Sequence, residues 1–207
     1  MKALQDVSLI IEKETTVAVV GKSGSGKTTL LNCMGGLERP DRGKVTCFDV
    51  PVHSLRGEAL SLFQRRNVGF VFQQGNLLSY LTVFENIAFP LTLNGVEEEK
   101  KANRIKGLLK SIGLEEAGNA LPHELSGGEV QRVSFARAVA HRPRMVLADE
   151  PTARLDSDTG RNLVKFMFHM CKEQGSTMVI STHDQEIIEL ADVRVHIRDG
   201  KIEKEAQ

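Results

Sequence analysis

The feature that most constrains the fold is a glycine-rich loop between a predicted strand and a predicted helix. Residues 16–20, TVAVV, form a short run rich in β-branched residues, which is typical of a buried strand. Residues 21–28, GKSGSGKT, follow at once and fit the pattern GxxxxGK[ST]. The next segment, TTLLNCMGGL, has helical apolar spacing and ends at paired glycines. This order predicts an α/β fold with a phosphate-binding loop at the end of a strand.

The chemistry of a phosphate site explains the residue types in this loop. Glycines let the backbone curl so that successive N–H groups point at one anion, and the following helix adds its positive end. Lys27 supplies a charge for the β- and γ-phosphates, and Thr28 offers a hydroxyl to Mg²⁺. A glycine-rich turn without a ligand is disfavoured by the position between strand and helix. The predicted nucleotide-binding residues are Gly21, Lys22, Ser23, Gly24, Ser25, Gly26, Lys27, Thr28 and Thr29.

Strands and helices alternate along the rest of the chain, which favours a mainly parallel sheet covered on both faces. Residues 82–140 differ, because helical patterns dominate there, and we interpret them as a subdomain inserted into a single domain of residues 1–207. Further strands are expected at residues 43–50, 67–72, 145–149, 177–182, 193–197 and 201–203. Further helices are expected at residues 84–93, 97–114, 157–175 and 185–191, and in the segment before Pro143.

Two carboxylates follow the predicted strand at residues 145–149. The segment reads MVLADE, and ligands collect at the carboxyl ends of parallel strands. Asp149 is therefore predicted to hold Mg²⁺, directly or through water, and Glu150 to polarise an attacking water. Structural ion pairs produce the same short pattern, so the prediction depends on the phosphate loop being present as well.

The overall composition excludes several classes of protein. Lys plus Arg and Asp plus Glu number 27 each, so no basic excess indicates nucleic-acid binding. No apolar run reaches the roughly 18–20 residues needed to span a bilayer, and the N-terminus does not resemble a signal peptide. The cysteines, Cys33, Cys47 and Cys171, form no CxxC pair, which favours a reducing cytoplasm. We expect a soluble chain that reaches a membrane only through a separate partner.

Residues 125–132, LSGGEVQR, resemble the signature motif of the ABC ATPases, and this is the most specific segment of the chain. Other segments match that family in the right order over nearly the whole length. They are the phosphate loop, a glutamine loop at Gln73 in VGFVFQQGNLL, the signature, Asp149–Glu150, a D-loop at Leu155–Asp156, and His183 in ISTHD. Gln74 is the alternative loop glutamine, and Gln73 is preferred because it directly follows FVF.

The resemblance implies an ABC ATPase fold, with an antiparallel β portion and the helical subdomain inserted in a RecA-like core. It also implies a head-to-tail homodimer that encloses two ATP, in which Ser126, Gly127 and Gly128 bind the γ-phosphate held by the other subunit. Gln73 would contact Mg²⁺ and the attacking water. His183 would hold the γ-phosphate and orient Glu150, although a lone histidine is more often a core or surface residue.

The same resemblance implies that Asp156 links the two sites across the dimer. Within the family, the strings GKSGSGKTTLLN, GFVFQQGNLL, LTVFENIAFPL and HELSGGEVQRVSFARA are most similar to the LolD-, MacB- and FtsE-type group, which serves lipoprotein release, macrolide export and cell division. The implied partner is a separate transmembrane permease, with the chain peripheral on the cytoplasmic face of the membrane. Leu77, Leu78, Tyr80 and Leu81 have two open interpretations, docking a partner helix or packing within the domain.

Three interpretations of function follow. The first is an ATP-hydrolysing subunit that energises transport or membrane remodelling. The second is a nucleotide-dependent regulatory module of a membrane complex, without transport. The third, a soluble ABC protein of DNA repair or translation, is disfavoured by the neutral charge and the absence of long coiled-coil arms.

The chain also departs from the family pattern. In the family, a first strand and an aromatic residue that stacks on adenine usually precede the segment KALQDVSL, and the given sequence starts where that segment should just have ended. Two interpretations are open: the start is truncated, or another residue covers the base. Loss of the stacking residue would predict weaker ATP binding. PTARLDS replaces the usual PTGNLDS and places Ala153 and Arg154 near the dimer contact, with no function assigned to either.

Overall fold

The computed structural model describes residues 2–206, and side chains through residue 203; the two terminal positions of the expected domain lie outside the described residues. The described chain contains a six-stranded sheet of order β2-β3-β4-β1-β5-β6. Its first five strands in that order pair in parallel, and β6 pairs antiparallel with β5. The strands are β1 (Thr16–Val20), β2 (Val68–Val71), β3 (Met145–Asp149), β4 (Thr177–Thr182), β5 (Val193–Arg198) and β6 (Lys201–Ala206).

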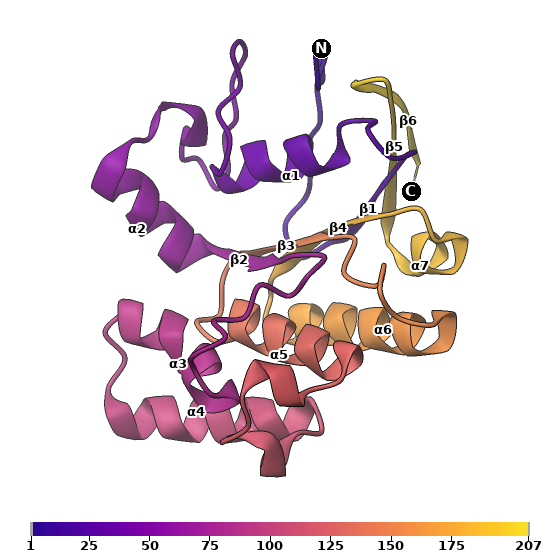
Figure 1. Ribbon diagram of the computed structural model, residues 1–207. Coiled ribbons are helices and arrows are strands. Elements are labelled where there is room, and N and C mark those ends of the chain that lie inside the picture. Colours follow the sequence, from indigo (N-terminus) through magenta and orange to yellow (C-terminus); the bar gives the residue numbers. More distant parts are fainter. Residues whose placement is uncertain (1, 207) are drawn as a thin grey trace.

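Helices cover both faces of this sheet, with α1 and α2 on one side and α3 to α6 on the other (Figure 1). The helices are α1 (Lys27–Gly35), α2 (Gly57–Asn67), α3 (Val83–Leu93), α4 (Glu98–Ser111), α5 (Gly127–Val139), α6 (Ser157–Glu173) and α7 (Gln185–Leu190). Short 3₁₀ turns lie at Val52–Ser54, Glu115–Ala117 and Pro122–Glu124. The expected α/β fold with a mainly parallel sheet is thereby confirmed.

Two apolar clusters hold the layers together, because successive side chains of a strand point to opposite faces of the sheet. In β1, Val17 and Val19 pack on the α1 side, whereas Ala18 packs on the side of α5 and α6. In β3, Leu147 faces α1 and Val146 faces the opposite cluster. Strands buried on both faces explain why these segments read as continuous apolar runs.

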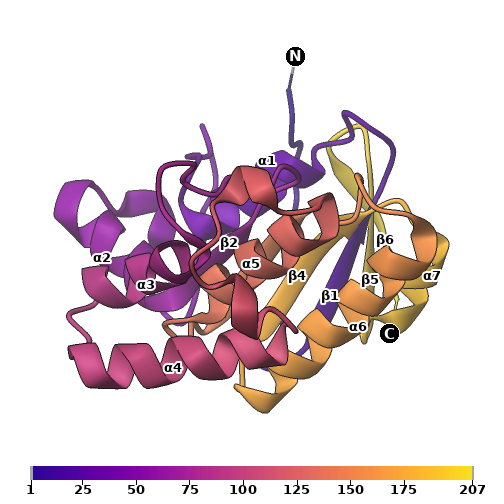
Figure 2. The ribbon, with the colours of Figure 1, turned by 60° about the horizontal axis from the view of Figure 1, so that its bottom comes forward.

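The segment between β2 and β3 is largely helical, as expected. Figures 1 and 2 place α4 on the outside of this group, with α3 and α5 between it and the sheet. Helix α3 begins at a capping box, in which the Thr82 hydroxyl accepts from the Glu85 N–H and the Glu85 carboxylate accepts from the Thr82 N–H. The boundaries of an inserted subdomain at residues 82–140 remain a prediction.

Two local expectations were wrong or incomplete. Residues 43–50 do not form a strand, because Phe48 and Asp49 adopt left-handed φ values of 54° and 67° and turn the chain back on itself. Only an isolated bridge from Cys47 to Val50 results. Helix α2 was not predicted, since most of its side chains are polar and only Phe63 is buried.

Among the described residues, none of the helices has both the length and the apolar character that crossing a bilayer requires.

Candidate active site

The loop of residues 21–26 leaves β1 and enters α1 through glycines in left-handed conformations. Gly24 has φ 77° and Gly26 has φ 108°, values that favour glycine. A Cβ atom at Gly26 would lie 2.5 Å from the Ala3 carbonyl oxygen, so no larger residue fits this backbone. No side chain caps the first turn of α1, which leaves its N–H groups directed at the mouth of the loop.

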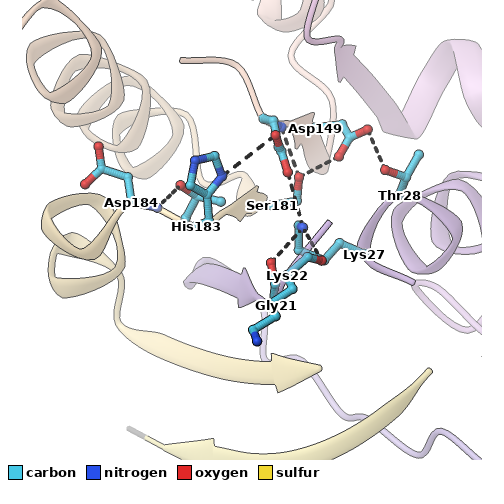
Figure 3. Close-up of polar contacts among 10 residues, drawn as sticks. Gly21, Lys22, Lys27, Thr28, Asp149, Ser181, His183 and Asp184 are labelled. Carbon is cyan, nitrogen blue, oxygen red and sulfur yellow. Dashed lines mark hydrogen bonds and ion pairs between the residues drawn. The ribbon is translucent and has the colours of Figure 1, made fainter. Parts of the chain in front are cut away.

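Lys27 lies inside the curl of this loop and is only 5% exposed. Its Nζ donates to the carbonyl oxygens of Gly21, at 2.8 Å, and Lys22, at 3.2 Å, as Figure 3 shows. The same Nζ lies 3.2 Å from Oε1 of Glu150. The structure therefore fixes one cationic group at the centre of the predicted phosphate site.

Asp149 ends β3 and contacts two hydroxyl groups from different elements. Its Oδ2 accepts a hydrogen bond of 2.9 Å from Thr28 Oγ1, and its Oδ1 accepts one of 2.5 Å from Ser181 Oγ (Figure 3). Thr28 and Asp149, two of the three predicted Mg²⁺ ligands, are thus neighbours. Ser181 was not predicted from the sequence. The feature that could have indicated it is a hydroxyl side chain near the end of the apolar strand at residues 177–182.

Glu150 is the first residue beyond β3 and has a left-handed φ of 43°. For a non-glycine residue this conformation costs on the order of 1–3 kcal/mol, and such strain is common at active sites. Its N–H donates to Ser181, to the carbonyl oxygen at 3.2 Å and to Oγ at 2.9 Å. These bonds hold the backbone that turns the Glu150 carboxylate back over Lys27.

His183 follows β4, and its side chain is 71% exposed. Its Nδ1 lies 3.9 Å from Oε2 of Glu150, a separation that a small side-chain movement would close. The next residue, Asp184, caps α7 by accepting from the Glu186 N–H. Strand β4 and helix α7 therefore present the histidine beside the carboxylate.

Lys27, Thr28, Asp149 and Glu150 line one open cleft of about 390 Å³, whereas His183 lines a smaller cleft that shares Glu150 with it. The lining of the larger cleft includes Gln73 and does not include Gln74. The lining residues are Ala3, Ser23, Gly24, Gly26, Lys27, Thr28, Thr29, Gln73, Asp149 and Glu150. The remaining loop residues, Gly21, Lys22 and Ser25, lie in the same loop without lining the cleft.

The predicted signature residues are not brought to this cleft. Ser126 caps α5 by accepting from the Glu129 N–H, and Gly127 and Gly128 form the first turn of that helix. Hydrogen bonds from the side chain and backbone of Ser126 hold the pKa of Glu129 below its usual value. Asp156 caps α6 and lines a second, smaller cleft beside Glu150 and His183.

The model of the ABC transporter family matches residues 4–153. An uncharacterised ABC transporter ATP-binding protein of Thermotoga maritima is 41% identical over 203 residues, which cover 98% of this chain and 86% of that protein. The lipoprotein-releasing system ATP-binding protein LolD of Bacteroides thetaiotaomicron is 40% identical, over 99% of this chain and 94% of its own length.

A solved structure is also similar over nearly the whole chain. The ATP-binding cassette MJ0796, from Methanocaldococcus jannaschii, superposes with a TM-score of 0.92 at 37% identity and covers 99% of this chain and 90% of its own. That structure is a dimer in a post-hydrolysis state, bound to ADP and Pi.

Proposed function

Because the chain belongs to the ABC transporter family of ATP-binding cassettes and is an ATPase of that family, we propose that the residues lining the larger cleft bind ATP and catalyse its hydrolysis. The observation that carries the proposal is that Lys27, Thr28, Asp149, Glu150 and Gln73 line one cleft, although they come from three distant parts of the chain. Lys27 and the N–H groups of the loop bind the β- and γ-phosphates.

The residues of the cleft fit a Mg²⁺ ion. Thr28 Oγ1 and Asp149 Oδ2 lie 2.9 Å apart and are the oxygen ligands that Mg²⁺ prefers. The described residues contain no group of three or more acidic, histidine or cysteine side chains that could hold a metal alone. That fits an ion bound by few side chains and by the phosphates of ATP, where it would neutralise charge. Gln73 completes the proposed ligands.

Glu150 orients and polarises the water that attacks the γ-phosphate. His183, 3.9 Å away, holds the carboxylate in place and contacts the γ-phosphate. Lys27 attracts the same carboxylate, so phosphate binding at Lys27 and the placement of Glu150 are coupled through one ion pair. Phosphoryl transfer of this kind depends on such positioning and on charge stabilisation rather than on a covalent intermediate.

The proposed active form is a head-to-tail homodimer. MJ0796 is dimeric, and here Ser126, Gly127 and Gly128 stand apart from the cleft at an N-terminal helix end suited to an anion. In such a dimer Asp156 would link the two sites.

A separate transmembrane permease would hold the chain at the cytoplasmic face of the membrane and use the energy of hydrolysis. The relatives that are named as transporter ATP-binding proteins support this partner.

The test separates metal binding from water activation. Asp149→Asn should raise the Mg²⁺ concentration needed for half-maximal hydrolysis, whereas Glu150→Gln should abolish turnover and still bind Mg·ATP. Both are near-isosteric replacements, and ATP binding and Mg²⁺ titrations should be measured on each. Unchanged turnover in Glu150→Gln, or an unchanged Mg²⁺ requirement in Asp149→Asn, would remove that residue from its assigned role.

A further inference from the structure

One face of α5 carries three polar side chains that bind the backbone of residues 72–76. Gln131, Ser134 and Arg137 are spaced three residues apart, so they project from neighbouring turns of one helix face. Gln131 is 3% exposed and Ser134 is completely buried. These groups lie between the helix that begins at the signature and the loop that carries Gln73.

Gln131 and Ser134 bind residues 72, 73 and 75 of the loop. Gln131 Nε2 donates to the carbonyl oxygens of Gln73, at 2.8 Å, and Phe72, at 3.3 Å. Ser134 Oγ donates to the Gly75 carbonyl oxygen at 3.0 Å. Gly75 is buried, so its carbonyl group needs a partner, and here that partner comes from α5.

Arg137 binds the far end of the loop with two parallel bonds. Its Nη1 donates to the Asn76 carbonyl oxygen at 2.7 Å, and its Nη2 to that of Gly75 at 2.8 Å. The backbone is also pressed against the helix, since a Cβ atom at Gly75 would lie 2.7 Å from Val130 Cγ1. Loop and helix are therefore joined by both polar bonds and close packing.

Gln131 makes its two hydrogen bonds to the loop although the other end of its amide group is left without a partner in the described part of the chain. Its Oε1 is buried and has no hydrogen-bond partner among the described residues. An unsatisfied buried acceptor lowers stability, and an apolar side chain of similar size would remove that penalty. What an apolar side chain could not supply is the donor to Gln73 and Phe72, which points to placement of the loop as the role of the amide.

We propose that Gln131, Ser134 and Arg137 are positioning residues that fix the 72–76 loop to the signature helix, with Gln131 setting the place of Gln73 at the cleft. The loop and the signature helix then move as one unit, so a displacement of either is transmitted to the other. The kinetic part of this inference rests on the proposed function, because it requires that Gln73 contributes to hydrolysis.

Amide hydrogen exchange tests the attachment without any nucleotide. Gln131→Met should accelerate exchange in residues 72–77, including the Gly75 N–H that donates to Phe72. The matched control is Arg104→Met, because Arg104 donates to the Val139 and Ala140 carbonyl oxygens at the opposite end of the same helix. Arg104→Met should leave exchange of the loop unchanged. Unchanged exchange in Gln131→Met, or equal acceleration in both variants, would overturn the attachment.

A double-mutant cycle tests the link to Gln73. Gln131→Met should lower kcat by tenfold up to about a hundredfold, the range that a displacement of about 1 Å can produce, with the Kd for ATP changed less than about twofold. In a Gln73→Ala background it should lower kcat no further. If exchange rises but the two effects on kcat are additive, Gln131 does not act through Gln73 and that part of the inference is wrong. If Gln73→Ala alone leaves kcat unchanged, the role of Gln73 in the proposed function fails while the attachment stands.

Discussion

At the scale of single residues, Ser181 connects the two acidic residues of the active site, through the side chain of Asp149 and the backbone of Glu150. It is fully buried, donates to Asp149 and accepts from the Glu150 N–H, so one hydroxyl orients a proposed metal ligand and the proposed water-activating residue. Strand register places it there, because Ser181 of β4 lies directly opposite Asp149 of β3.

Ser181→Ala should therefore impair the site while hardly changing the volume of the side chain. The change removes a hydrogen bond to a charged acceptor, which contributes about 1.5–3 kcal/mol. We expect a higher Mg²⁺ requirement and a lower kcat, with the Kd for ATP largely retained. Steady-state hydrolysis across a Mg²⁺ titration checks this. Wild-type kinetics at every Mg²⁺ concentration would show that Ser181 orients neither carboxylate.

Cys171 is predicted to be unreactive in the folded chain. Burial raises the pKa of its thiol to about 12, so the reactive thiolate is scarce at neutral and mildly alkaline pH. Alkylation at pH 9, followed by peptide mapping, should leave Cys171 unmodified in native protein and modify it fully in denaturant. The half-buried Cys47 serves as the internal comparison. Modification of native Cys171 at its denatured rate would contradict the prediction.

At the scale of elements, the starts of α3 and α5 repeat one device, a hydroxyl cap with a glutamate three residues later. Hydrogen bonds from the backbone and side chain of Thr82 hold the pKa of Glu85 below its ordinary value of 4.5. The cap is therefore strongest above that value and weakens as the pH falls through the lowered pKa.

Thr82→Ala should destabilise the α3 region by about 1 kcal/mol at neutral pH. The difference from wild type should shrink in acid, because protonation of Glu85 weakens the same cap in the wild-type chain. Urea unfolding at a series of pH values measures this difference. A difference that stays constant down to full protonation of Glu85 would assign the effect to the threonine alone.

Elements also show how far the amino-acid sequence predicts this molecule. Long periodic segments such as α4 and α6, and apolar runs such as β1 and β3, were predicted because burial sets their pattern. Residues 43–50 were mispredicted because the left-handed turn at Phe48 and Asp49 has no glycine to mark it.

In the active site, too, some residues could be predicted from local sequence motifs and others depend on the tertiary structure. Lys27, Thr28, Asp149 and Glu150 follow from local patterns. Ser181, and the attachment of Gln73 by Gln131, depend on strand order and helix packing, which local patterns do not contain.

At the scale of the whole molecule, we predict that mixing two inactive variants restores hydrolysis, because each ATP site is proposed to be built from the phosphate loop of one subunit and the signature of the other. Lys27→Ala lacks a working phosphate loop, and Gly127→Asp lacks a working signature. In a mixed head-to-tail dimer, one site combines the intact loop of one subunit with the intact signature of the other. Hydrolysis should therefore appear in the mixture and in neither variant alone. A mixture as inactive as its components would contradict a shared site.

The most direct test of the central claim is the rate of Mg·ATP hydrolysis measured against protein concentration, with Glu150→Gln as the matched inactive variant. The account predicts a rate that rises more steeply than linearly at low concentration, because two chains must meet to form a site, and near-complete loss of hydrolysis in Glu150→Gln. A rate strictly proportional to concentration that survives Glu150→Gln would contradict both the dimeric site and the role of Glu150.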